Sequence, residues 1–154
     1  MTRPAIVYGL VLAIGSATAD DKKDVPSELA PFQGTWKIVK VQILGEDNPK
    51  GNPSKGARGI FAGNKMTMKG GKEEGGKEES SESRFSVDPN KNPAELDVVD
   101  SDGNRSQWIY KFDKDGKLVI CVELSFGKEP APRPKSFDTK DTGYLVFVLE
   151  KVKE

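Results

Sequence analysis

Carboxylates are the side chains in this sequence best suited to acid–base chemistry, because its 154 residues include no histidine. Histidine is the commonest general base and metal ligand, so its absence excludes serine–histidine and cysteine–histidine catalysis and histidine-bound zinc or haem. Glu95, Asp97 and Glu123 are of the type that a glycosidase pairs across its cleft, but their spacing fixes no such pair. We therefore predict no catalytic residues and a protein that is not an enzyme.

Two Asp-x-Asp-Gly sequences, at 100–103 and 113–116, have the composition of a calcium loop. An EF-hand loop needs glycine at its sixth position and glutamate at its twelfth. The first sequence places Arg105 and Lys111 there, and the second places leucine at both. Aspartate and glycine at these points are typical of tight hairpin turns. We predict neither a metal site nor a cofactor.

Aromatic side chains form the more informative group. Five of them fall on strand patterns that could converge: Trp36, Trp108, Tyr110, Phe112 and Phe147. They predict either a filled core or a small apolar pocket at one end of a barrel, since an eight-stranded barrel is of the size that permits both. These five residues and Arg133 are the candidate ligand-binding residues.

The first nineteen residues have the pattern of a cleavable secretory signal. Arg3 supplies the positive start, residues 5–15 are almost wholly apolar, and 17–19 read Ala-Thr-Ala before the first acidic residues. The apolar run is shorter than the roughly 20 residues of a membrane span. No cysteine follows it, so a lipid anchor at that site is excluded. We expect cleavage after Ala19 and a soluble, exported product, periplasmic or secreted, with no membrane span.

The remaining 135 residues are enough for one domain with a core. Loss of Arg3 takes the net charge from 0 to −1, and this balance argues against nucleic acid as a partner. Cys121 is the only cysteine, so no disulfide can form within the chain. It is either a small buried side chain, which we favour, or a site of intermolecular pairing.

Short alternating segments separated by turn formers predict an all-β domain. Strands are expected at 35–44, 57–62, 65–69, 83–88, 95–100, 105–113, 117–124 and 144–152. A short helical turn that ends at Pro31 should precede them. The prediction is a single eight-stranded antiparallel up-and-down barrel over residues 29–153, after a flexible segment at 20–28.

The first strand changes phase in its middle. Trp36 and Ile38 lie on one face, whereas Val39, Val41 and Ile43 lie on the other. A β-bulge near Val39 and Lys40 would bring both groups into one core.

The last two strands are apolar on both faces, so their outer surface needs a cover. The N-terminal segment with Leu29 and Phe32 could provide it, or another protein chain could. Residues 45–56 and 70–79 are expected to be long loops, the second because it repeats Gly-Gly-Lys-Glu-Glu without any apolar residue. Residues 127–134 are rich in proline and should be extended.

Several of these features together resemble a family of uncharacterised lipocalin-like domains found in planctomycete bacteria. They are Gly-Thr-Trp at 34–36 after Phe32, the late-strand Cys121, Arg-Pro-x-x-Phe at 133–137, and an apolar last strand that ends at Lys151. The resemblance covers residues 29–153 and implies an up-and-down barrel, but no particular activity. Lipocalins often stack an arginine on the signature tryptophan, which makes Arg133 the candidate to stack on Trp36.

Three functions follow as hypotheses. The first is an exported, non-catalytic barrel that binds a small apolar or amphipathic ligand. The second is a module for protein interaction or assembly, with a protein partner or a second copy on the outer face of the last two strands. The third is an enzyme of unknown type.

Overall fold

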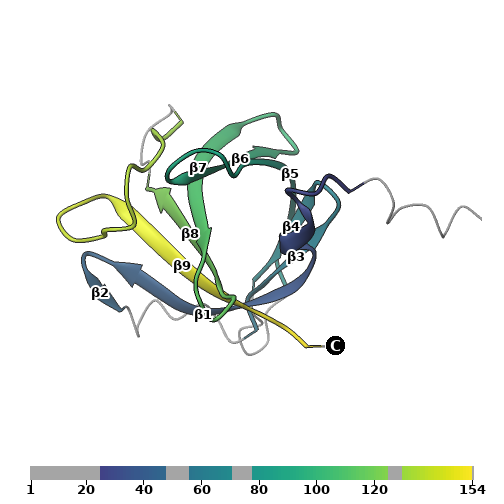
Figure 1. Ribbon diagram of the computed structural model, residues 1–154, viewed down its shortest axis with the longest axis horizontal. Helices are drawn as coiled ribbons and strands as arrows, with labels where there is room; N and C mark the ends of the chain where they lie inside the picture. The colour runs from purple at the N-terminus through teal and green to yellow at the C-terminus, as the bar shows by residue number, and fades with distance from the viewer. Residues whose placement is uncertain (1–24, 48–55, 71–77, 125–129, 154) are drawn as a thin grey trace, which may run out of the picture.

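The computed structural model describes residues 25–47, 56–70, 78–124 and 130–153 (Figure 1). The predicted signal peptide and its cleavage point lie outside these residues, as do 48–55, 71–77 and 127–129 in the predicted loops. The described part is a closed antiparallel barrel of eight strands with one short additional strand, so the predicted fold class is confirmed.

Alternation of apolar and polar residues produces the strands, and glycine-containing turns separate several of them. The strands are β1 (Gly34–Ile43), β2 (Glu46–Asp47), β3 (Arg58–Ala62), β4 (Lys65–Lys69), β5 (Ser80–Asp88), β6 (Ala94–Asp100), β7 (Arg105–Phe112), β8 (Leu118–Glu123) and β9 (Tyr144–Lys151). From β3 to β9 each strand pairs with the next along the chain. Strand β2 was not predicted. It has two residues and forms a short antiparallel hairpin with the end of β1.

Strand β1 closes the barrel by pairing with β3 through residues 34–37 and with β9 through residues 36–43. Ile38 pairs with Leu149 and Lys40 with Val148, so Val39 is the extra residue of a β-bulge. This confirms the predicted bulge. Val41 and Ile43 lie opposite Phe147 and Leu145, although Val39 itself remains 36% exposed.

One end of the barrel, here called the closed end, is plugged by the N-terminal segment. A single 3-10 turn, η1 (Ala30–Phe32), leads into β1 and includes Pro31, which therefore does not end the turn as predicted. Phe32 is completely buried and lies within 6 Å of four other rings, measured between ring centroids: Phe61, Phe85, Tyr110 and Phe112.

Two polar side chains fix this plug. The indole Nε1 of Trp36 donates a hydrogen bond of 2.6 Å to the carbonyl of Phe32. The amide of Gln33 bonds the carbonyl of Leu29 and both backbone groups of Gly63, in the turn between β3 and β4. Val25 also packs against the core.

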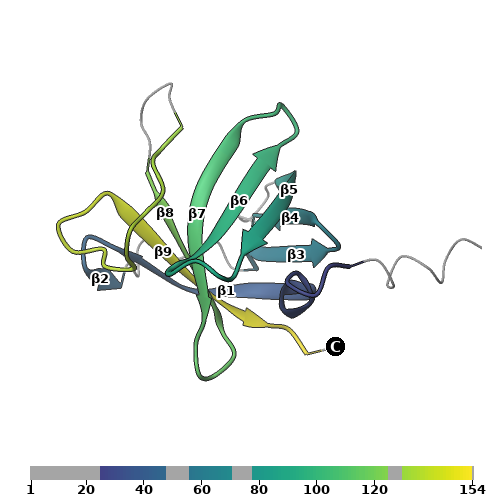
Figure 2. The same ribbon diagram turned by 45° about the horizontal axis from the view of Figure 1, so that its top comes forward.

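Of the two covers considered for the outer face of β8 and β9, the segment with Leu29 and Phe32 was wrong, because both side chains are buried inside the barrel. A different segment covers that face, the connection from β8 to β9. Its described residues 130–143, here called the strap, lie along the outside of the barrel (Figures 1 and 2). Phe137 packs there on a cluster formed by Ile109, Val119, Cys121 and Val146.

The strap is also held by polar contacts. The thiol of Cys121 lies 3.4 Å from the carbonyl oxygen of Ser136 and is buried, as predicted. Buried Thr139 accepts a hydrogen bond of 3.0 Å from the backbone N–H of Gly45, at the tip of the β1–β2 hairpin. The apolar outer surface is therefore packed under the protein's own chain.

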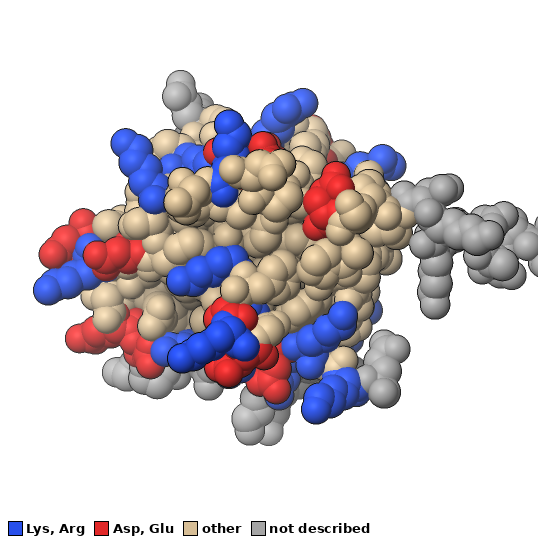
Figure 3. All heavy atoms as spheres, in the orientation of Figure 1, with Lys and Arg blue, Asp and Glu red and all other residues tan. Residues whose placement is uncertain are grey.

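Figure 3 shows lysine, arginine and acidic side chains interspersed over one face of the molecule, without a large patch of either sign. Of the helical segments in the described residues, none has the length and apolarity to cross a membrane.

Candidate functional site

A small apolar cavity lies inside the barrel, beyond the aromatic plug. Its volume is about 50 Å³, and its lining has no polar surface. The lining residues come from β1, β3, β4, β7, β8 and β9: Ile38, Phe61, Met66, Met68, Trp108, Ile120, Val122, Phe147 and Leu149. One water molecule needs a cavity of about 10–15 Å³, so this cavity can hold a small apolar group.

The cavity has a closed floor and an open side. Its floor residues are deeply buried: Phe61, Met66, Ile120 and Leu149. Its wall residues remain only partly buried: Ile38, Met68, Trp108, Val122 and Phe147. The exposure therefore rises from the plugged end toward the opposite end, here called the open end, where the connections β6–β7 and β8–β9 begin.

The predicted aromatic residues divide between the plug and the cavity. Trp36, Tyr110 and Phe112 pack around Phe32 and belong to the filled half. Trp108 and Phe147 line the cavity. The two alternatives drawn from the sequence thus both apply, one to each half of the barrel.

Arg133 lies elsewhere, on the outside of the barrel in the strap. Its guanidinium donates to Asp97 at 2.5 Å and to the carbonyl of Trp108 at 2.7 Å, and it lies 3.6 Å from Glu95. The cation over the Trp36 ring is instead Lys151, whose Nζ lies 5.7 Å from the ring centroid. The predicted stack of Arg133 on Trp36 was therefore wrong.

The position of Arg133 has a cause in the register of the sheet. Pairing between β7 and β8 ends at Ile109 and Cys121, so Trp108 pairs only with β6. Its carbonyl has no partner in β8, and Arg133 supplies the donor. Asp97 and Glu95, which are of the residue type that a glycosidase uses, instead bind the guanidinium of Arg133.

Besides Phe61, sequence reasoning missed six aliphatic and thioether side chains of the cavity wall and floor: Ile38, Met66, Met68, Ile120, Val122 and Leu149. The alternation did place each on an inner face. The alternation could not show how far along the barrel axis each residue lies from the closed end. Whether a residue lines the cavity depends on where the Phe32 plug ends.

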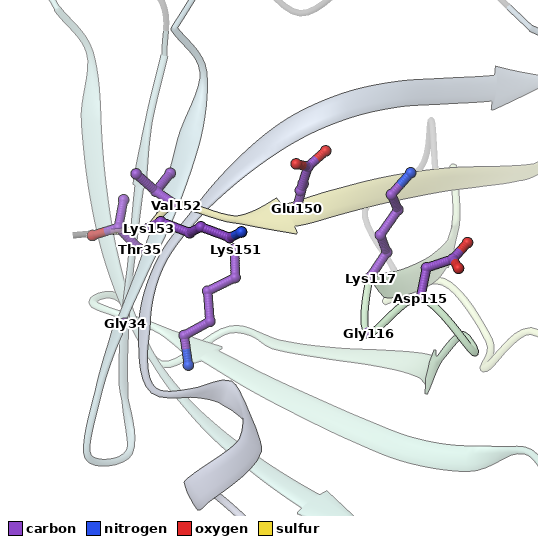
Figure 4. A pocket seen from close by; sticks show the side chains of 9 residues that line it. All are labelled: Gly34, Thr35, Asp115, Gly116, Lys117, Glu150, Lys151, Val152 and Lys153. Atoms are coloured by element: carbon purple, nitrogen blue, oxygen red, sulfur yellow. The ribbon is translucent and has the colours of Figure 1, made fainter.

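A second, larger hollow of about 790 Å³ lies at the closed end, between the β7–β8 turn and the end of β9. Its charged residues are Asp115, Lys117, Glu150, Lys151 and Lys153. Figure 4 shows that Glu150 and Lys151 point to opposite sides of β9, and Lys117 away from Lys151. These groups do not converge on one point, so the hollow lacks the geometry of a binding site.

In the described residues, the titratable side chains with shifted pKa values do not gather into one polar site. Burial raises the pKa of the Cys121 thiol to about 12, so it is neutral and a poor nucleophile. Hydrogen bonds from Asn104 hold the pKa of Asp100 below its usual value. Within the ranges that the structure covers, no cluster of three acidic or cysteine side chains fits a metal ion.

Comparisons of the chain with protein-family models, with curated proteins and with solved structures found no match. The resemblance to planctomycete lipocalin-like domains therefore stays a prediction.

Proposed function

We propose that the protein is a non-catalytic binding barrel for a small apolar group, or for the apolar end of an amphipathic molecule. The observation that carries this proposal is the cavity lined only by apolar surface, with half-buried Trp108 and Phe147 in its wall. A barrel used only as a scaffold gains stability from filling such a space, because each missing contact weakens the core. An unfilled apolar space beside a partly exposed aromatic wall is the expected form of a ligand site.

Toluene is a suitable first probe, since it has no polar group and its binding would depend on burial alone. Its methyl group fits the cavity of about 50 Å³, and its ring would lie against the partly exposed wall. We expect it to change the emission of Trp108, which lines the cavity, and not that of Trp36, which is 2% exposed in the plug. Fluorescence titrations of the Trp36→Phe and Trp108→Phe variants separate the two signals.

A second test fills the cavity from its wall, and a matched substitution outside the barrel is its control. Val122→Phe adds a ring where the lining is only partly buried, and it should abolish the toluene response. Val99→Phe makes the same exchange on the β6 face that carries Asp97, away from the core, and should leave the response intact. Absence of any response to toluene in the unaltered protein would contradict the proposal.

The second hypothesis, an assembly module, was based on the bare outer face of the last two strands. The strap now accounts for that face, with Phe137 packed over it. No observation on the described residues favours a partner there, and we do not propose one.

Export of the chain, its lipocalin-like ancestry and its lack of enzymatic activity belong to the same proposal. The signal-like first nineteen residues and the Gly-Thr-Trp at 34–36 support the first two. Expression with cell fractionation and determination of the mature N-terminus tests export, and an N-terminus other than Asp20 would contradict the expected cleavage.

A further inference from the structure

The open end of the barrel has two unlike halves. On one half, three serines share the inner face with core residues, because directly paired residues of neighbouring strands lie on the same face. The pairs are Met68 with Ser81, Met66 with Ser83, and Val98 with Ser106. We call Ser81, Ser83 and Ser106 the serine rim. Ser106 lies on β7, two residues beyond Trp108 of the cavity wall, and Ser81 and Ser83 lie on β5 beside Met68 and Met66 of the lining.

The other half of the open end is apolar. The corresponding inner-face positions on β1, β8 and β9 are Val41, Ile43, Val122 and Leu145. A molecule that enters the cavity from this end would therefore pass between hydroxyl groups and hydrocarbon.

The charge near the serine rim is negative. Asp100 pairs with Ser83 and accepts hydrogen bonds from the backbone N–H groups of Asp102 and Asn104, which keep it ionised. At this end, the inner-face positions of the described strands include no lysine or arginine. A carboxylate brought here would find no cation on the inner face of these described strands and would face Asp100.

We propose that the ligand is a neutral amphipath, whose hydrocarbon end fills the cavity and whose hydroxyl or amide group bonds the serine rim. This inference rests on the proposed function, since it describes the polar part of the same ligand. Each serine hydroxyl can donate one hydrogen bond and accept two, which suits an alcohol or an amide. An ammonium group would lose hydration on entry and gain only the solvent-exposed Asp100.

Three six-carbon probes that differ only in head group test the proposal: 1-hexanol, hexanoate and hexylammonium at pH 7.5, titrated against Trp108 emission. We expect 1-hexanol to have a dissociation constant about tenfold below that of either ion, since a charged group pays more to leave water. An ion that binds as tightly as 1-hexanol overturns the proposal.

The serines are tested by substitution. In a Ser83→Ala/Ser106→Ala variant, the affinity for 1-hexanol should fall about fivefold, as for loss of a neutral hydrogen bond, while toluene affinity stays unchanged. Ser86→Ala is the control, because Ser86 lies on the same strand but on the outer, exposed face. Equal affinity of the double variant and the unaltered protein for 1-hexanol overturns the role of the rim.

The outcomes for the two proposals are separable. If toluene binds but 1-hexanol shows no preference over the ions, this inference fails and the apolar binding site stands. If neither toluene nor any six-carbon probe changes Trp108 emission, the proposed function fails, and this inference with it.

Discussion

Phe32 plugs the closed end of the barrel with a single aromatic side chain. It has no exposed surface and touches rings from β3, β5 and β7. The Trp36 indole bonds its carbonyl, so the ring and its backbone are both fixed. The depth of the cavity is set where this plug ends.

Truncation of this ring is therefore expected to be costly. We predict that Phe32→Ala lowers the free energy of unfolding by about 3–5 kcal/mol, through lost burial and the space left behind. Denaturant unfolding measures the loss. Val39→Ala, at the exposed bulge, should change the same quantity by less than about 0.5 kcal/mol, and a similar loss in both variants would argue against the plug.

Cys121 gives a prediction about alkaline pH. Burial raises the pKa of its thiol from the usual 9.0 to about 12, so the folded state holds the proton more tightly than the unfolded state. That contribution to stability is complete below pH 9 and is lost as the pH rises toward 12. In Cys121→Ala, stability should fall less steeply over this range. The buried Tyr110, whose pKa is also raised, contributes to the fall in both proteins. Equally steep falls in the variant and the unaltered protein would contradict the role given to Cys121.

The same thiol should resist alkylation at pH 8 in the folded protein, since thiolate is the reactive form. This is a separate consequence of burial under the strap and is measured by mass spectrometry with and without denaturant.

Among the elements, the strap is held by Arg133 in addition to the contacts of Ser136, Phe137 and Thr139. Arg133 joins Asp97 and Glu95 of β6 to the otherwise unpaired carbonyl of Trp108 on β7. The guanidinium is largely buried, at 19% exposure, which makes its contacts stronger than those of a surface ion pair.

We predict that Arg133→Ala loosens the strap without unfolding the barrel. The free energy of unfolding should fall by about 1–3 kcal/mol, and a non-specific protease should cut within 130–143 faster. Arg133→Lys should be intermediate, because an ammonium cannot bridge all three acceptors in the plane of a guanidinium. Lys135→Ala is the control, since its side chain is exposed; cleavage as fast in that variant would contradict the role of Arg133.

Strand prediction from the sequence succeeded where one strand's own pattern carried the information. The alternation in β7 and β9 and the phase change in β1 predicted the strands and the bulge. The placement of Phe32 and Arg133 could not be predicted in the same way. Each depends on a contact between distant segments, and the alternation of residues within a strand does not encode such contacts. For the site, Trp108 and Phe147 were predicted, whereas the limits of the cavity were not.

At the scale of the whole molecule, the barrel is asymmetric along its axis. The closed end contains η1, the hydrogen bonds of Gln33 and the aromatic cluster, whereas the open end contains the cavity and the serine rim. The two tryptophans lie on either side of this boundary, so they report on the two ends separately.

Acrylamide quenching should make the asymmetry measurable. With only Trp36 present, in Trp108→Phe, the emission should be blue-shifted and quenched several-fold less than in Trp36→Phe, where only the half-buried Trp108 remains. Circular dichroism checks that both variants keep the barrel. Equal quenching of the two variants would mean that the open end is as sealed as the closed one.

The bulge at Val39 has a consequence for how the gene can change. Without codon 39, β1 would read as a regular alternating strand, with Trp36, Ile38, Val41 and Ile43 still on one face. Such a deletion would remove curvature and leave the inward pattern intact, whereas loss of one codon from the unbulged β9 would turn half its core residues outward. Length variation in this gene is therefore expected to be tolerated at codon 39 before it is tolerated elsewhere in the closing strands.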